Sequence, residues 1–285
     1  MFKNIGIVGA GQMGRGIAEV CARAGLAVTL YDISEDAARD GLSAIDASLS
    51  RVVQRGGISA TERERVLASI TPTGDLAQLA GADLVIEAAT EREDLKTALF
   101  RQLDETAAPA TVLASNTSSI PIARLAEATQ RADRVVGLHF FNPVPLMPLV
   151  EVVPSLRTSE PTVAAVRDFA ADTLGKTVIT APDRAGFIVN SLLVPYLLAA
   201  VRMVDAGHAT AADVDTGMTA GCAHPMGPLR LADLIGLDTV AAIGEAMYEE
   251  YREPAFAPPP LLRRMIEAGL LGRKSGRGFF AYPAP

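Results

Sequence analysis

The feature that most constrains the fold of this 285-residue chain is a glycine-rich turn directly behind its first apolar run. Residues 5–14 read IGIVGAGQMG, so a β-rich stretch runs into the pattern GxGxxG, formed by Gly9, Gly11 and Gly14, and a helix-like stretch follows. Glycines at this spacing let the backbone turn tightly and approach a pyrophosphate, while the helix N-terminus offers free N–H groups to the anion. The pattern therefore favours a strand–turn–helix unit that binds a dinucleotide.

An acidic residue stands where such a unit needs one. The next β-rich run, residues 27–31, ends in Asp32, at the place where a carboxylate accepts hydrogen bonds from both hydroxyls of an adenosine ribose. The alternative is a plain glycine turn, with Asp32 serving only as the N-cap of the next helix. Because the strand, the helix, the second strand and the acid are all present, we predict a bound dinucleotide. A carboxylate repels a 2′-phosphate, which favours NAD over NADP.

Strand-like and helix-like stretches alternate over the first two thirds of the chain. The β-rich runs are IGIVG, AVTLYD, ADLVIEA, TVLAS, RVVGLHF, LVEVVP and KTVIT. The helix-like stretches between them are residues 12–24, 35–55, 92–105 and 161–174, and those after Asp183, where the strands stop, are 186–206, 211–219, 237–251 and 260–268. This order predicts an α/β fold, a Rossmann-type doubly wound and mainly parallel sheet, followed by a smaller all-α domain. We place an NAD-binding domain at residues 1–183 and the helical domain at 184–285.

Composition and charge argue against several classes of protein. With 49% hydrophobic and 21% charged residues, the chain is typical of a folded globular protein. Its formal net charge of −7 argues against nucleic acid and anionic membrane surfaces as partners. The most apolar segment, residues 191–204, contains Pro195 and Arg202 and is short for a membrane span. Cys21 and Cys222 form no CxxC pattern, so we expect no disulfide framework, no metal site and a reducing, cytoplasmic location.

Polar residues follow two later β-rich runs. The run at residues 111–114 leads into Ser115–Ser119 (SNTSS), and the run at 134–138 ends in His139. In doubly wound sheets, ligands bind at the carboxyl ends of strands, and a histidine suits proton transfer because its pKa lies near neutrality. Glu151 is a charged residue inside an apolar run and needs a partner if it is buried, so it can orient His139. The alternative for His139 is a structural core histidine, and its position at a strand end favours catalysis.

Seven segments together resemble one enzyme family. They are GAGQMGRGIA, SNTSSI, GLHFFNPVP, LVEVVP, DRAGFIVN, HPMGPLRLADLIGLD and GRKSGRGFF. In order and over nearly the whole chain, they resemble the 3-hydroxyacyl-CoA dehydrogenases, most closely the bacterial 3-hydroxybutyryl-CoA dehydrogenases. The GxGxxG part is common to many dehydrogenases, whereas the SNTSS, HFFNP and DRxGFIVN segments are far more specific.

The resemblance implies a role for each matching residue. His139 is the catalytic base, and the acid in reduction, with Glu151 as its carboxylate partner. Ser118 contacts the substrate oxygen and the nicotinamide side, and Asn190 hydrogen-bonds the substrate from the helical domain. The matches that fall on the cofactor are Gly9, Gly11, Gln12, Met13 and Gly14 at the pyrophosphate, Asp32 at the adenine ribose, Glu91, Lys96 and Asn142 near the nicotinamide half, and Lys274 from the C-terminal loop. The implied reaction is NAD-dependent oxidation of short (S)-3-hydroxyacyl-CoA to 3-oxoacyl-CoA, and its reverse.

The CoA part of such a substrate carries phosphates, and the resemblance places Ser48, Arg51 and Arg55 beside it. Relatives usually carry lysines at the two arginine positions, and arginine keeps the charge. The two arginines, four residues apart on one helix face, could also form only a solvated surface. Pro148 stands where many relatives have lysine, which removes a positive group near the site. The resemblance also implies a homodimer formed mainly through the helical domain.

Two other functions stay open. The same chemistry could act on an acyl group carried by an acyl carrier protein, whose acidic surface would meet Arg51 and Arg55. Alternatively, the chain could be a non-catalytic NAD-binding protein on the same fold. The ordered set of Ser118, His139, Glu151 and Asn190 argues against the second of these.

Overall fold

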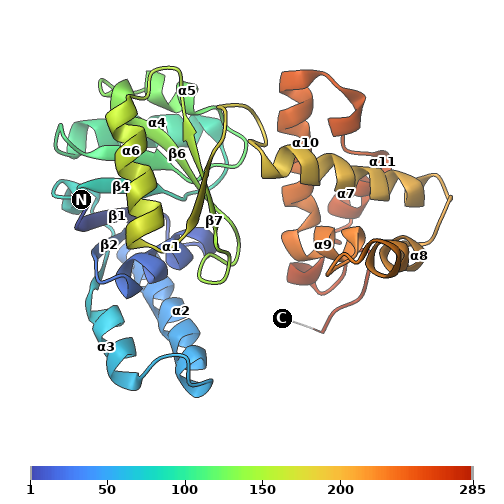
Figure 1. Cartoon of the computed structure of the whole chain (residues 1–285), viewed down its shortest axis with the longest axis horizontal. Helices are drawn as coiled ribbons and strands as arrows, with labels where there is room; N and C mark the ends of the chain where they lie inside the picture. The colour runs from blue at the N-terminus through green and yellow to red at the C-terminus, as the bar shows by residue number, and fades with distance from the viewer. Residues whose placement is uncertain (1, 284–285) are drawn as a thin grey trace. The chain divides into compact units, whose positions relative to one another are not determined.

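A single eight-stranded sheet forms the centre of the first part of the chain (Figure 1). The computed structural model describes residues 2–283. The strands are β1 (Asn4–Val8), β2 (Ala27–Tyr31), β3 (Ile70–Thr73), β4 (Leu84–Glu87), β5 (Val112–Ser115), β6 (Val135–Phe140), β7 (Leu149–Pro154) and β8 (Thr177–Thr180). Their order is β3-β2-β1-β4-β5-β6-β7-β8, and all neighbours are parallel except the antiparallel pair of β6 and β7. The predicted doubly wound, mainly parallel fold is confirmed.

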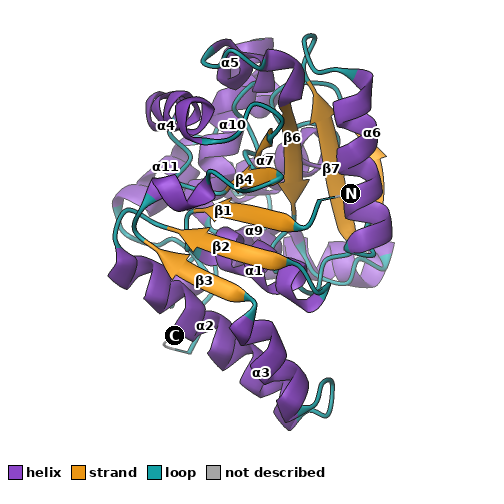
Figure 2. Cartoon of the chain, turned by 90° about the vertical axis from the view of Figure 1, so that its left-hand side faces the viewer, coloured by secondary structure: helices purple, strands orange, loops and turns teal. Residues whose placement is uncertain are grey.

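Helices cover both faces of this sheet. They are α1 (Gln12–Arg23), α2 (Glu35–Gln54), α3 (Ala60–Ala68), α4 (Glu93–Thr106), α5 (Ile122–Glu127) and α6 (Glu160–Asp168). Figure 2 shows β1, β2 and β3 side by side, with α2 and α3 along them. Val136 and Leu138 belong to a buried cluster with residues of α1, α2 and α6, whereas a side chain on Gly137 would face Ile122 of α5. Because side chains alternate along a strand, α5 lies on the opposite face.

The strand order reverses between β1 and β4, and this reversal positions the site. β1 pairs with β2 on one side and with β4 on the other, and the chain leaves β1 for β2 and later returns to β4. In open α/β sheets, such a reversal leaves a crevice beyond the carboxyl ends of the strands, where ligands bind. The residues after β1, β2, β4, β5 and β6 are therefore the candidates for a site.

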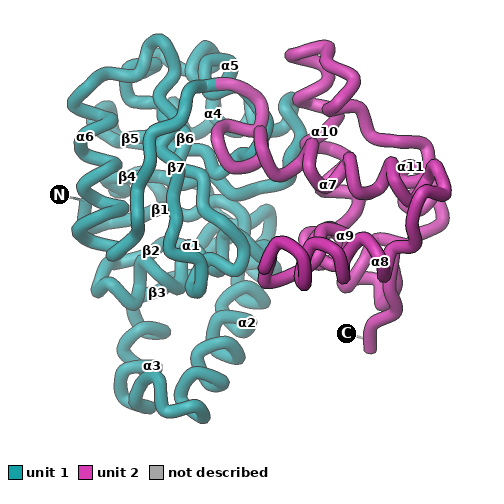
Figure 3. Tube along the Cα trace, turned by 45° about the vertical axis from the view of Figure 1, so that its right-hand side comes forward, with its two compact units in different colours: residues 1–183 teal, residues 184–285 magenta. Residues whose placement is uncertain are grey.

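The chain divides into two compact units, residues 1–183 and 184–285 (Figure 3). The second unit is helical, with α7 (Val189–Asp205), α8 (Ala211–Thr216), α9 (Pro228–Ile235), α10 (Leu237–Tyr251) and α11 (Pro260–Glu267) around its own apolar cluster. Fully buried Asp233 of α9 accepts hydrogen bonds from Phe279 N, Phe280 N and the Tyr282 hydroxyl, each at 3.0 Å, which fixes the last segment on this unit. Within residues 2–283, no helix is long and apolar enough to cross a membrane.

Several elements were not predicted. β3 is short and contains Pro72, which a sheet tolerates at its edge, and β3 is an edge strand. Helices α3, α5 and α9 are six to nine residues long, and helices this short are hard to distinguish from loops by their sequence pattern. The predicted stretch at 161–174 keeps its helical course, but its last part, Phe169–Thr173, widens into a π-helical segment.

Candidate active site

The turn after β1 has the close backbone approaches that its glycines predict. Gly9 adopts a φ of 98°, which favours glycine, and a Cβ on Gly14 would lie 1.7 Å from the carbonyl oxygen of Gly9. Gly11 is the N-cap of α1, and a Cβ there would meet no atom within 4 Å. The first turn of α1 thus has an open space at its N–H groups, where an anion can bind. This cradle fits a pyrophosphate.

Asp32 lies at the carboxyl end of β2, next to this turn. Its Oδ2 accepts a hydrogen bond from Ala10 N at 2.7 Å, and its Oδ1 accepts one from Ile33 N at 2.7 Å. The N-cap of α2 is Ser34, whose hydroxyl accepts a hydrogen bond from Ala37 N at 3.2 Å. The alternative role of Asp32 as a helix cap is therefore wrong. Tied to the glycine turn and partly exposed, its carboxylate fits the ribose of a dinucleotide.

His139 and Glu151 form a buried pair across two neighbouring strands. They are directly opposite in the antiparallel register of β6 and β7, and His139 Nδ1 lies 2.7 Å from Glu151 Oε2. His139 is 6% exposed and Glu151 is fully buried, and the ring of Phe141 packs 4.6 Å from the imidazole. An ionised carboxylate can only accept, so an ionised Glu151 pairs with the tautomer that carries its proton on Nδ1 and its lone pair on Nε2. That tautomer suits a general base.

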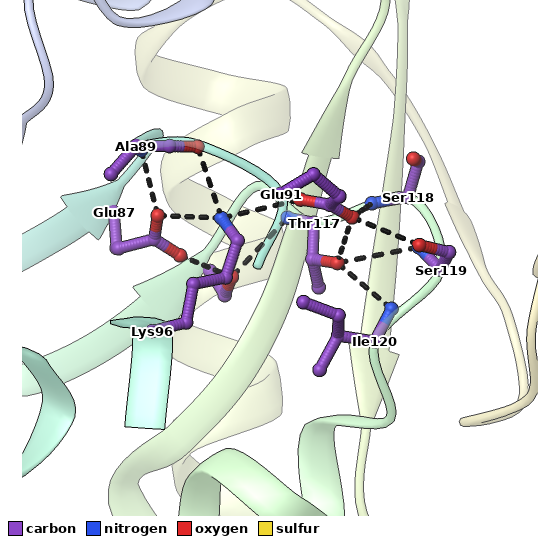
Figure 4. A network of polar contacts seen from close by, with 9 residues as sticks. Glu87, Ala89, Glu91, Lys96, Thr117, Ser118, Ser119 and Ile120 are labelled. Atoms are coloured by element: carbon purple, nitrogen blue, oxygen red, sulfur yellow. Dashed lines mark hydrogen bonds and ion pairs between the residues drawn. The ribbon is translucent and has the colours of Figure 1, made fainter. Parts of the chain in front are cut away.

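The residues after β4 and β5 form a connected polar network (Figure 4). Glu91 Oε1 accepts hydrogen bonds from the Thr117 hydroxyl, from Ser118 N at 3.0 Å and from the Ser119 hydroxyl at 3.1 Å. Partial burial works to raise the pKa of Glu91, but Lys96 and these donors outweigh it and lower the pKa. Lys96 itself is 1% exposed, and its ammonium contacts acceptors of Glu87, Ala89 and Glu91. A direct contact between Lys96 and a cofactor stays a prediction.

A cavity of about 360 Å³ opens between α1, α2 and the segment after β6. Ser48 and Arg51, predicted at the CoA phosphates, line it together with Gln12 and Asn142 from the predicted cofactor set. The Gln12 amide donates to Asn142 Oδ1 at 3.1 Å, which links the glycine turn to the segment after β6. Arg55, one turn further at the end of α2, is not among the lining residues. Met13 packs against the apolar core instead of facing this cavity.

Glu19 of α1 is an acid in the wall of this cavity that the sequence did not single out. It is 3% exposed, and Arg23 is its ion-pair partner at 3.7 Å, too long for a hydrogen bond. Burial raises the pKa of Glu19, although the Ser48 hydroxyl, Arg23 and Arg51 all act in the opposite direction. The folded protein thus favours the neutral form of this carboxyl more than the unfolded chain does.

Replacing Glu19 by Gln is expected to change how stability depends on pH. Because the folded-state pKa is raised, the stability linked to the neutral carboxyl is present at low pH and is lost as the pH rises above the unfolded-state value. As the pH rises from about 4 to about 8, the Tm of Glu19→Gln should therefore increase by a few degrees relative to the Tm of wild type. Glu64→Gln, on the exposed surface of α3, is the control and should show no such trend. Parallel pH curves for Glu19→Gln and wild type would contradict the raised pKa.

Two predicted site residues belong to the second unit. Asn190 lies in the first turn of α7 and is 8% exposed. Lys274 is half exposed, and its ammonium lies 2.6 Å from the carboxylate of Asp238. Their roles toward substrate and cofactor stay predictions.

Within residues 2–283, no three His, Cys, Asp or Glu side chains are arranged to hold a metal ion.

Glu87 is a second buried acid near the site that the sequence reasoning missed. It ends β4, is fully buried, and joins the network through Lys96, Ala89 and Ser115. The signal that pointed to Glu151, a charged residue within an apolar run, is also present in the sequence LVIEAA around Glu87. Glu19, inside the apolar pattern of α1, carries the same signal.

A doubly wound sheet with a glycine-rich turn after β1 and an acid after β2 defines a dinucleotide-binding domain of an oxidoreductase. Models of the 3-hydroxyacyl-CoA dehydrogenase NAD binding domain and C-terminal domain match residues 4–184 and 186–282. The chain belongs to the 3-hydroxyacyl-CoA dehydrogenase family, and its cofactor is NAD.

The relatives extend over the whole chain. A 3-hydroxybutyryl-CoA dehydrogenase of Mycobacterium tuberculosis is 54% identical over 282 residues, which cover 99% of each chain. A probable 3-hydroxybutyryl-CoA dehydrogenase of Bacillus subtilis is 44% identical over 99% of this chain and 98% of its own. The crystal structure of (S)-3-hydroxybutyryl-CoA dehydrogenase from Ralstonia eutropha is 44% identical and covers 99% of this chain and 100% of its own, with a TM-score of 0.94.

Proposed function

We propose that this chain oxidises short (S)-3-hydroxyacyl thioesters of CoA, with 3-hydroxybutyryl-CoA as the main substrate, and reduces the 3-oxo product in the reverse direction. The single observation that carries the proposal is the contact of 2.7 Å between His139 Nδ1 and Glu151 Oε2 at the carboxyl end of β6. The relatives that cover the whole chain bear names for this activity, which supports the choice of substrate.

In this proposal, His139 removes the hydroxyl proton. Glu151 accepts from Nδ1, keeps the lone pair on Nε2 and stabilises the imidazolium that forms. NAD supplies a hydride acceptor when it is bound. Phe141 packs on the imidazole and keeps water from one side of the base, whereas Phe140 is buried in the core on the opposite face of the sheet.

Three regions of the first unit are assigned to the ligands. Gly9, Gly11 and Gly14 hold the pyrophosphate, and Asp32 holds the adenine ribose. Ser118, whose main-chain N–H is fixed by Glu91, contacts the substrate oxygen. The cavity that Ser48 and Arg51 line takes part of the CoA, with the guanidinium group as a phosphate partner.

An assay of NADH oxidation with acetoacetyl-CoA tests this function. We expect turnover on the order of 10 per second, with NADPH a much poorer donor because Asp32 repels its 2′-phosphate. The same assay with acetoacetyl groups on an acyl carrier protein separates the two kinds of carrier. NADH binding without turnover of either thioester would instead support a non-catalytic NAD-binding protein.

We also infer a homodimer formed through the helical unit. Leu192 and Met203 of α7 are 74% and 45% exposed, and an interface over this helix would cover both apolar side chains. Light scattering on the purified chain measures its mass, and a monomer at micromolar concentration would argue against the dimer.

A cytoplasmic location stays a prediction, which separation of soluble and membrane fractions of cells would test.

A further inference from the structure

Arg15 of α1 is a positive side chain in the wall of the cavity that Ser48 and Arg51 of α2 line. The lining residues of α1 are three, one and three positions apart, which places them on one face of the helix: Gln12, Arg15, Gly16 and Glu19. Helices α1 and α2 lie next to each other (Figure 1). Arg15 and Arg51 therefore border the same space from two different helices.

The guanidinium groups of Arg15 and Arg51 make no hydrogen bond and no ion pair within residues 2–283. Arg51 acts on Glu19 through its charge alone, from beyond ion-pair distance. By contrast, Arg63 of α3 donates a hydrogen bond to Asp46 of α2 at 2.7 Å. A guanidinium carries five N–H donors and remains charged at any physiological pH, so both arginines of the cavity keep their donors for an anion.

Charge and room in the cavity both suit a phosphate group. Among the described residues that line it, Glu19 is the single acid beside the two arginines. Glu19 is buried, and burial raises its pKa, which works against a negative charge in the wall. Gly16, Ala44 and Ala47 are small lining residues, and the open volume of about 360 Å³ lies within the range of ligand pockets. The cavity thus offers two free cations and space for part of a larger ligand.

We propose that Arg15 is a substrate-binding residue that holds a phosphate of CoA in this cavity together with Arg51. The inference rests on the proposed function, which places part of the CoA here. Guanidinium groups bind phosphate through charge-assisted, often bidentate hydrogen bonds, and two of them on separate helices can contact it from different sides. The phosphates of CoA are far from the carbon that loses its hydride. Arg15 therefore strengthens binding and leaves the chemical step unchanged.

The first experiment compares Arg15→Gln with wild type. Gln removes the charge and, like Arg, is a good helix former. We expect the Kd of CoA, measured by calorimetry, and the KM of acetoacetyl-CoA to rise about tenfold, while kcat and the NADH Kd stay within about twofold. Arg101→Gln is the matched control, because Arg101 is exposed on α4 and does not line the cavity. It should leave all four quantities unchanged.

A thioester without phosphates makes the test specific. S-acetoacetyl-N-acetylcysteamine carries the same acyl group as acetoacetyl-CoA but ends before the first phosphate. For this compound we expect kcat/KM of Arg15→Gln to match wild type within about twofold, because the lost contact does not exist in either protein. The same measurement shows whether the variant is correctly folded. If Arg15→Gln does not fold, Arg15→Ala replaces it, since Ala is the best helix former.

Calorimetry with 3′-dephospho-CoA identifies which phosphate is held. If Arg15 binds the 3′-phosphate, Arg15→Gln and wild type should bind this compound equally. If Arg15 binds the diphosphate, the difference of about tenfold should persist. Either result supports the proposal, provided that Arg15→Gln binds CoA itself more weakly than wild type does.

The other outcomes separate this inference from the proposed function. Unchanged CoA affinity in Arg15→Gln, or an equal loss of kcat/KM on the N-acetylcysteamine thioester, would overturn the role of Arg15 while wild-type turnover preserves the function. A rise of about tenfold in the NADH Kd with unchanged CoA affinity would place Arg15 at the dinucleotide instead and overturn it as well. A wild-type chain that binds CoA through Arg15 without turnover would overturn the function alone. A chain that neither turns over nor binds CoA would overturn both.

Discussion

Replacement of His139 by Gln should lower kcat for acetoacetyl-CoA by about two orders of magnitude or more, while NADH binds almost as tightly as before. Gln keeps hydrogen-bonding groups of similar size, but it cannot take up a proton near neutral pH. The cofactor residues around the glycine turn lie on other elements and are unchanged by it. Steady-state rates and a fluorescence titration of NADH give the two quantities.

His208→Gln is the matched control for this substitution. His208 is exposed in the second unit, just after α7, so the same chemical change there should leave both kcat and the NADH Kd unchanged. Turnover by His139→Gln at more than about a tenth of the wild-type rate would remove His139 from the proton transfer. A large rise in the NADH Kd would point to a structural role instead.

Gly14→Ala should abolish NADH binding and destabilise the first unit by about 3 kcal/mol or more. Its Cβ would lie 1.7 Å from the Gly9 carbonyl oxygen, a backbone atom, so the turn after β1 has to move. Denaturant unfolding and NADH titration measure the two effects. We therefore expect the close contact between the end of β1 and the start of α1 to tolerate added side-chain atoms poorly.

Gly11→Ala separates cofactor binding from stability. A Cβ on Gly11 would meet no atom within 4 Å, and its φ of −68° is ordinary for alanine, so the fold should lose less than about 0.5 kcal/mol. The methyl group does, however, occupy the space through which a pyrophosphate approaches the backbone, and we expect the NADH Kd to rise about tenfold or more. Wild-type affinity in this variant would argue against a pyrophosphate at this turn.

Much of the fold could be predicted because the strands of a covered parallel sheet are continuous apolar runs. All seven predicted runs form strands, and the GxGxxG turn identifies the order around β1. The remaining strand, β3, and the short helix α5 were not predicted, because four to six residues carry too little pattern to distinguish them from a loop. Their positions depend on tertiary packing, such as the contact of Ile122 with the face of β6.

The site was predictable where one residue stands out from its own segment. His139 and Glu151 each interrupt an apolar run, and the register of β6 and β7 then brings them together. The network of Glu87, Lys96 and Ser115 joins three elements that are up to 28 residues apart, and nothing local relates them. The resemblance named Lys96 as a cofactor residue, and its burial among three acceptors could only be seen in three dimensions.

The antiparallel pairing of β6 and β7 has a consequence for how members of such a family can diverge. Successive side chains of a strand alternate between faces, so one residue inserted within β7 would turn Glu151 away from His139. Residues 141–148 connect the two strands and include Asn142, Pro143, Val144 and Pro145 of the cavity wall. Insertions and deletions in this connection can reshape the cavity while neighbouring β5 and β8 keep both strands in register. Substrate range and acid–base chemistry are thereby free to evolve separately.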